Sequence, residues 1–390
     1  MTADRAAERR LLTFAVGSQA SISVTSWGLG SLGPELRDTF HLSAFGLGAV
    51  LAASFIGNAA ILVPAGGFVD RTGPRMSLIV GGFASGVAMV AAAFAPNAIL
   101  VGLALFVFGL TGAFVAIAGT VSIFHGFATE RRGMAMGVRQ MSVAGGGLLA
   151  AALLPWLATV GGVRLAFIVS GLLVALFATL FGFASPPGAL SAEAAGRKME
   201  VMAILRTPGV LRVLTIAVVH VASLAAVLNF SVAAIRDEGY SRVVGVALFA
   251  TISISAMLAR LAWGRIADWN GGTRRRRTLM DVAVVTIAGG LLYWAATPFG
   301  PAAQLPAMFI LAFGAMGANG ILHLMAGEFA GPERAGQAVG MASMMLFGGG
   351  ALASFPLGLL ADHAGFVYLW PVCALLGVGS LTLSLGLPDR

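Results

Sequence analysis

Charged residues are scarce in this chain, since Asp, Glu, Lys and Arg make up only 10% of its 390 residues. A soluble domain carries roughly 25% charged residues, and here 58% of the residues are hydrophobic, so water is not the main solvent of this protein. The one cysteine, Cys373, lies in an apolar run, which excludes a disulfide framework and a cysteine-based metal cluster. The charged start, Met1 to Arg10, is followed by no small-residue cleavage site, so we expect no cleaved signal peptide.

Long apolar runs fill most of the sequence. A bilayer core about 30 Å thick takes roughly 20 apolar residues per helix. This rule predicts an all-α membrane protein with twelve spans, near 11–34, 44–66, 76–95, 98–124, 136–159, 164–185, 211–235, 243–265, 278–298, 303–327, 337–360 and 366–386. The polar stretch between the sixth and seventh spans divides the chain into a six-helix bundle over 1–185, a linker over 186–210 and a second bundle over 211–390.

The basic residues are distributed unevenly between the two sides of the predicted spans. Most of the 24 Lys and Arg residues fall at the N-terminus, in the loops after even-numbered helices and at the C-terminus. The opposite loops hold Arg37, Arg164, Arg236 and Arg242. Such asymmetry predicts that both termini and the linker are cytoplasmic, and it makes the net charge of +8 a topology signal rather than evidence for nucleic-acid binding.

Two segments repeat between the halves of the chain. GGFVDRTGPR, from Gly66 to Arg75, is echoed by WGRIADWNGG after the eighth span, and in both a Gly precedes the Asp by four residues and another follows it by three. ERRGMAMG, ending at Gly137, is likewise echoed by ERAGQAVG, ending at Gly340. Parallel six-helix repeats of this kind are typical of membrane transporters.

With these motifs the whole chain resembles the major facilitator superfamily. The resemblance rests on Gly66, Asp70, Arg71, Gly73 and Arg75, with a second copy at Gly264, Asp268 and Gly271. It implies two pseudo-symmetric bundles that rock about a central site by alternating access, so we expect no enzyme activity and no cofactor. It also implies that Asp70 and Arg75 form a cytoplasmic latch, with Asp70 near the start of helix 11, where the positive end of a helix dipole favours an acid.

The resemblance also suggests a substrate class. GVRQMSVAGGGLLAAALLP, from Gly137 to Pro155, is similar to bacterial cyanate-permease-like and other small-anion carriers. Arg260, four residues before Gly264, is similar to the helix 8 Arg that binds substrate carboxylate in monocarboxylate carriers, although Ala256 stands where those carriers often have an acid. The drug-exporter pattern is incomplete, because Leu105 replaces the helix 4 Arg and Ala150 replaces a helix 5 Gly.

Polar groups inside the spans are costly and are therefore candidate functional residues. Arg260 is the first candidate for the anion anchor, because a guanidinium binds carboxylates bidentately. Snorkelling or hydrogen bonding between the bundles is the alternative for it and for Arg139. His323 and His220 are the candidate proton carriers. The other candidate substrate contacts are Gln19, Trp27, Asn58, Gln140, Asn229 and Asn319, with helix packing as the alternative for the Ser and Gly stripe of helix 1.

The sequence therefore predicts a monomeric carrier of a small organic anion, a symporter or exchanger in a bacterial inner membrane whose partners are the anion, protons and lipid. An exporter of amphipathic compounds and a lipid flippase are alternatives on the same fold. A membrane enzyme or sensor is disfavoured, because the sequence holds no HExxH motif, no paired intramembrane carboxylates and no signalling domain.

Overall fold

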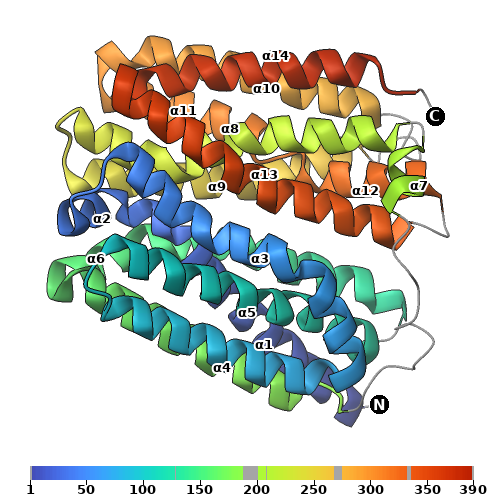
Figure 1. The fold of residues 1–390 in the computed structure, drawn as a ribbon. Helices are drawn as coiled ribbons and strands as arrows, with labels where there is room; N and C mark the ends of the chain where they lie inside the picture. The colour runs from blue at the N-terminus through green and yellow to red at the C-terminus, as the bar shows by residue number, and fades with distance from the viewer. Residues whose placement is uncertain are drawn as a thin grey trace. The chain divides into compact units, whose positions relative to one another are not determined.

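The structure is a computed structural model that describes residues 2–127, 129–187, 201–207, 209–267, 275–331 and 335–388. The regular elements in this part of the chain are all helices (Figure 1). The first half holds α1 (Thr2–Ser26), η1 (Gly28–Leu32), α2 (Gly33–Phe40), α3 (Ala44–Thr72), α4 (Pro74–Ala93), α5 (Ala98–Gly126) and α6 (Thr129–Ala184). The second half holds α7 (Val201–Leu205), α8 (Val210–Asp237), α9 (Arg242–Ala267), α10 (Arg275–Ala296), η3 (Thr297–Phe299), α11 (Pro301–Ala315), α12 (Asn319–Ala330), α13 (Ala335–Ala364), η4 (Phe366–Tyr368) and α14 (Leu369–Leu385).

Each predicted span is largely helical, and ten helices among the described residues are long and apolar enough to cross a membrane. The fifth and sixth spans both lie in α6, where Gly161 and Gly162 leave helical geometry and separate two helices. Gly162 has a φ of 66°, which a residue without Cβ adopts readily. The first span ends earlier than predicted, since α1 stops at Ser26 and the chain continues as the 3₁₀ helix η1.

Contacts divide the chain into two compact units that differ from the predicted bundles at one place. The N-terminal unit comprises Met1–Phe40 and Ala53–Lys198, and the C-terminal unit comprises His41–Ala52 and Met199–Arg390. The first turns of α3 therefore pack with the C-terminal unit, and the rest of the helix packs with the N-terminal unit. The linker residues 188–200 lie outside the described part, and the predicted bundle boundaries stay a prediction.

Small residues bring the helices of the N-terminal unit close together. A Cβ built on Gly82 of α4 would lie 2.1 Å from Cβ of Ala178 in α6, and one built on Gly86 would lie 2.7 Å from the carbonyl oxygen of Gly171. Gly57 of α3 similarly meets the backbone of α5, at 2.1 Å from the oxygen of Phe106. Glycine at such contacts lets helix backbones approach, which is the usual basis of helix packing inside a membrane.

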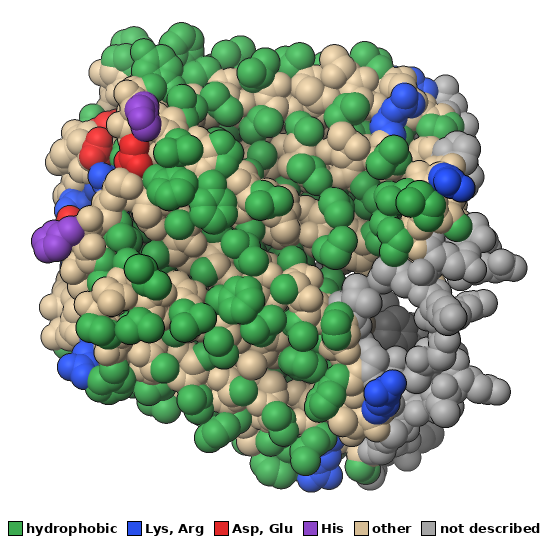
Figure 2. Space-filling model, in the orientation of Figure 1, with side chains coloured by type: hydrophobic (Ala, Val, Ile, Leu, Met, Phe, Trp, Pro, Cys, Tyr) green, Lys and Arg blue, Asp and Glu red, His purple; other side chains and the backbone are tan. Residues whose placement is uncertain are grey.

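The C-terminal unit is built around α8, which is buried almost continuously from His220 to Ile235. Its neighbours in this unit include α9, α13 and α14. Large apolar side chains are exposed on other helices of both units, for example Ile99 of α5 at 82% and Leu352 of α13 at 68% of their full area. Figure 2 shows hydrophobic side chains over much of the visible surface, as expected of faces that contact lipid rather than water.

Candidate transport site

The tenth predicted span is broken in its middle. Helix α11 ends at Ala315, residues 316–318 form turns, and α12 begins at Asn319. The sequence favours this break, because Gly314, Gly317 and Gly320 are poor helix formers and lie close together. Such discontinuous helices are where many transporters hold their substrates, since the break frees backbone groups and helix ends inside the membrane.

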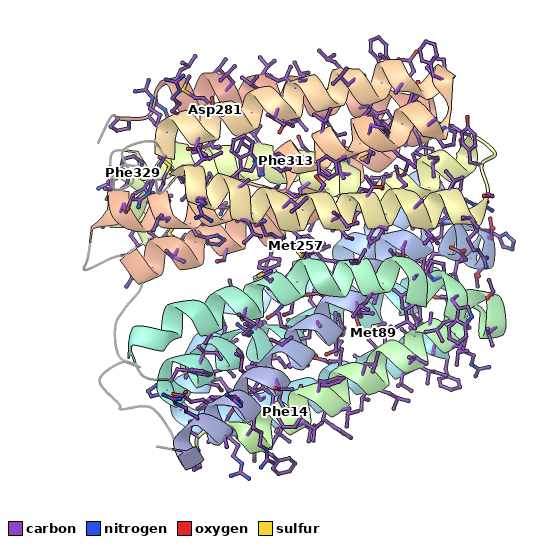
Figure 3. All side chains as sticks on the ribbon, turned by 180° about the vertical axis from the view of Figure 1, so that it is seen from behind. Phe14, Met89, Met257, Asp281, Phe313 and Phe329 are labelled. Carbon is purple, nitrogen blue, oxygen red and sulfur yellow. The ribbon has the colours of Figure 1, made fainter. Side chains whose placement is uncertain are left out.

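Trp263 of α9 fills the space at the break. A Cβ built on Gly317 would lie 2.1 Å from Cδ1 of this indole, so no larger residue fits there. The N–H of Gly317 bonds to the oxygen of Gly314 instead of continuing the α-helical pattern to Phe313. The indole Nε1 of Trp263 donates to the freed oxygen of Phe313 over 3.0 Å, and the two rings pack 5.4 Å apart. The broken backbone is therefore supported by a side chain from the neighbouring helix (Phe313 is labelled in Figure 3).

Arg260 lies one turn before Trp263 on α9. The exposed face of this helix carries Ile254, Leu258 and Leu261, whereas Arg260 is partly buried. At about 100° per residue, Arg260 points away from the middle of that face. Ser255 donates to the oxygen of Phe309 over 2.7 Å, so α9 follows α11 along the stretch that contains Arg260. The side chain of Arg260 thus leaves α9 away from its exposed face, one turn before the indole at the break.

His323 is the best-connected candidate proton carrier. Its Nδ1 lies 2.6 Å from the backbone oxygen of Asn319, and its Nε2 lies 2.9 Å from Oγ of Ser343 in α13. The Ser343 hydroxyl also lies 3.0 Å from the oxygen of Val339. Because a carbonyl only accepts, Nδ1 carries the proton in the neutral ring, and Ser343 then donates to Nε2. A protonated ring would donate from both nitrogens, and Ser343 would turn to donate to Val339.

Asn319 starts α12 beside His323. Its Oδ1 is buried and has no hydrogen-bond partner among the described residues. No side chain caps this helix start, which follows Ala318. The first N–H groups of a half-helix and its dipole favour negative charge, so this end of α12 adds positive potential at the break.

The two polar residues of α8 are buried. Asn229 donates from Nδ2 to Oγ of Ser354 in α13 over 3.0 Å, so its amide joins two helices. His220 is 4% exposed, and its Nε2 has no partner among the described residues. The sequence places them on opposite sides of α8, yet both are enclosed because α8 is buried all round.

Arg139 in the N-terminal unit is held by a neighbouring helix. Its Nη1 donates to Oγ1 of Thr120 over 3.1 Å and its Nη2 donates to the oxygen of Ala116 over 3.2 Å. A Cβ built on Gly119 would lie 2.6 Å from Nη2, so that glycine makes room for the guanidinium. The side chain is 4% exposed. These contacts give Arg139 a helix-joining role between α5 and α6.

The remaining substrate candidates of the N-terminal unit are partly buried. Gln19 lies in α1, and Trp27 occupies the junction between α1 and η1. Asn58 lies beside the tight crossing of α3 and α5, where a Cβ on Gly109 would lie 1.9 Å from the oxygen of Ser54. Its Oδ1 is buried and has no partner among the described residues.

The predicted gating residues are only partly described. Arg71 is exposed, Arg75 lies with its guanidinium 5.5 Å from the ring centre of Phe183, and Gly73 takes a φ of 80° before α4. The surroundings of Gly66, the side chain of Asp70 and all of Asp268 lie outside the described part, as does the side chain of the substrate candidate Gln140. The cytoplasmic latch therefore stays a prediction.

The partners that fix these side chains lie on other helices and leave no recognisable pattern in the sequence. Ser343, Ser354 and Thr120 are hydroxyl residues in apolar helices, and nothing in their local sequence distinguishes them from helix-packing residues. Trp263 is the first residue of the repeated loop motif WGRIADWNGG. The one available signal is its position three residues after Arg260.

The ten long apolar helices among the described residues are those of a protein that crosses a membrane several times. The family model described as Major Facilitator Superfamily matches residues 15–354, and the chain belongs to this superfamily. It is thus a secondary transporter with multiple spans and not an enzyme. Two relatives, both described as uncharacterized MFS-type transporters of Mycobacterium tuberculosis, are 27% identical over 332 residues, covering 82% of this chain and 71% of theirs.

Solved structures are similar in fold. The nucleoside transporter NupG has a TM-score of 0.78 at 15% identity, over 97% of this chain and 99% of that chain. A D-xylose-proton symporter has a TM-score of 0.77 at 14% identity, over 97% and 98%. A bacterial homolog of the human lysosomal transporter Spinster, captured inward-facing and unoccupied, has a TM-score of 0.70 at 14% identity, over 98% and 95%. At these identities the likeness concerns the fold alone.

Proposed function

We propose that this transporter moves a small organic anion, with a monocarboxylate as the model substrate, and that Arg260 binds the carboxylate. The observation that carries the proposal is a partly buried arginine that leaves α9 away from its exposed face, one turn from the indole that supports the break in span 10. A guanidinium stays charged at every relevant pH and matches a carboxylate with two parallel hydrogen bonds. The uncapped start of α12 adds favourable potential for the same charge.

Proton coupling is the second part of the proposal. His323 supports it, because the ring keeps both hydrogen bonds in either protonation state if the Ser343 hydroxyl reverses. His220 is the other candidate and lacks such a partner for Nε2 among the described residues. Exchange of one anion for another, without proton transfer by either histidine, is the alternative mechanism.

Asn319 and Asn229 are the proposed polar contacts from the C-terminal unit, and Gln19, Trp27, Asn58, Arg139 and Gln140 those from the N-terminal unit. The hydrogen bonds of Arg139 to α5 favour helix joining for that residue. We further propose a monomer in a bacterial inner membrane, with both termini cytoplasmic, on the distribution of Lys and Arg between the loops.

A thermal-shift screen of the purified protein tests the substrate class. Small carboxylates, inorganic anions and drug-like cations are each added, and a ligand at 100 times its Kd should stabilise the protein by about 2.7 kcal/mol. We expect one carboxylate to raise the Tm of the parent protein and of Arg265→Gln, a control that removes an exposed charge from the same helix. Arg260→Gln should lose the shift.

Two outcomes would redirect the proposal. A Tm shift by carboxylate that persists in Arg260→Gln would reject this residue as the anchor. Stabilisation by amphipathic cations alone, equal in both variants, would favour the exporter of amphipathic or lipid-like compounds.

A further inference from the structure

The start of α3 is capped by an acid from the end of α13. Oδ1 of Asp362 accepts a hydrogen bond from the backbone N–H of Ala44 at 2.6 Å, and Oδ2 accepts one from Phe45 at 2.8 Å. The next two N–H groups bond to Ser43, through its hydroxyl and its carbonyl oxygen. The bond to the carbonyl oxygen is the first helical one, so three N–H groups without helical partners are satisfied by side chains, and Asp362 supplies two of these three bonds across 318 residues of sequence.

The helices touch closely along the same stretch. A Cβ built on Gly358, one turn before Asp362, would lie 2.7 Å from Cα of Phe45 and 2.8 Å from the oxygen of Ala44. A Cβ on Gly48 would lie 2.6 Å from the oxygen of Ser354. The rings of Phe45 and Phe355 pack 5.7 Å apart. A glycine from each helix therefore makes the approach possible, and the carboxylate closes it at the end.

This contact explains why α3 is divided between the two units. His41–Ala52 groups with the C-terminal unit although the rest of α3 groups with the N-terminal unit. A charge-assisted hydrogen bond is roughly twice as strong as a neutral one, and an acid at a helix start also gains from the helix dipole. Asp362 is nevertheless exposed, so water can solvate its carboxylate when the bonds open. These two hydrogen bonds can therefore hold the start of α3 on α13 and can also be exchanged for bonds to water.

We propose that Asp362 is a conformational latch, which holds His41–Ala52 on α13 and is released when this end of the transporter opens. Alternating access requires each end to open in turn, and the ends of α3 and α13 that meet at Asp362 must then separate. The resemblance gives Asp70, at the other end of α3, an equivalent role at the start of α13. The same helix pair would thus carry one acid at each end, each on the other helix's N-terminus.

The proposal can be tested without a known substrate, because it predicts a distance. Cysteines replace the exposed His41 and His363, which flank the contact, in a background where the buried Cys373 is replaced by Ser. Spin labels on them report the distance distribution by pulsed electron paramagnetic resonance in nanodiscs. The parent should show a short distance, and Asp362→Asn should add a longer-distance population. Asp38→Asn, which removes an exposed acid three residues before His41 in the sequence, should match the parent.

A second variant keeps the test decisive if Asp362→Asn does not yield monodisperse protein. Gly358→Ala leaves the carboxylate in place but puts a methyl group against the α3 backbone, so it should shift the distribution in the same direction. Retention of the parental distribution by every variant that purifies would overturn the latch. Since no substrate is involved, that result would leave the anion proposal untouched, and failure of the anion screen would leave the latch untouched.

Discussion

The indole nitrogen of Trp263 donates to the carbonyl oxygen of Phe313, and this bond replaces the one that the α11 backbone loses where span 10 breaks. The bond joins two helices at the level where Arg260, Asn319 and His323 occur. The support of the break and the proposed binding of an anion therefore depend on the same pair of helices. This dependence can be measured.

Replacement of Trp263 by Phe should weaken both properties. The variant keeps most of the ring but leaves the Phe313 oxygen without its donor, so we expect a loss of about 1 kcal/mol in stability and weaker anion binding. Thermal unfolding and ligand-induced shifts measure the two effects. Trp156→Phe, at an indole that is 60% exposed, is the matched control and should change neither. An unchanged Trp263→Phe variant would show that the break does not need this bond.

Arg139 and Thr120 should be energetically coupled. Residues in one hydrogen-bond network typically show interaction energies of about 0.5–3 kcal/mol, whereas independent sites add. A double-mutant cycle of Arg139→Gln and Thr120→Val, read by thermal unfolding, should therefore give less than the sum of the single losses. Additive losses would mean that the bond contributes nothing, and loss of anion binding without loss of stability would instead support a substrate role for Arg139.

Proton coupling should depend on His323 and on Ser343. His323→Gln with His220→Gln should abolish proton uptake that accompanies substrate entry into proteoliposomes, measured with an internal pH dye. The single variant Ser343→Ala should reduce proton uptake, because the protonated His323 ring loses the acceptor for its Nε2–H. Ser380→Ala, a buried serine on α14, is the control and should behave as the parent. Proton uptake that persists without both histidines would reject them as carriers.

Glu238 at the end of α8 should make stability depend on pH. Burial raises the pKa of this carboxyl above its ordinary value, while the hydrogen bond from Gln304, 2.6 Å from Oε2, opposes the shift. A pKa that is higher in the folded protein means that stability is greatest at low pH and falls as pH rises through the folded value. Glu238→Gln, which stays neutral and can still accept from Gln304, should remove this fall.

Thermal unfolding between about pH 4 and 8 measures the Glu238 effect, a range that brackets the ordinary glutamate pKa and a raised one. The informative quantity is the difference in Tm between parent and variant, which should grow in favour of the variant as pH rises. Asp38→Asn, at an exposed acid, should show no such trend. A difference that is constant across the range would contradict the burial effect.

The sequence by itself was enough to place the protein in a membrane, to locate its spans and to indicate its family. Apolar run length is a local property, and each of the twelve predicted spans is largely helical. The repeated Gly-Asp-Gly loop is equally local and led to the superfamily that the family model matches. Arg260 and His323 could be chosen as candidates because an ionisable residue in an apolar run is conspicuous in the sequence.

Only the tertiary structure decided which polar residues meet. Span 10 reads as one apolar run, but its glycines break the helix where Trp263 from α9 takes the space and the freed oxygen. Arg139 donates a hydrogen bond to Thr120, and Asn229 donates one to Ser354, in each case on another helix. In the sequence Asp362 is only a charged residue at the end of a predicted span, and only the fold brings its carboxylate to the N–H groups of Ala44 and Phe45. Hydropathy is summed along the chain, whereas a hydrogen bond depends on positions in space that distant helices fix together.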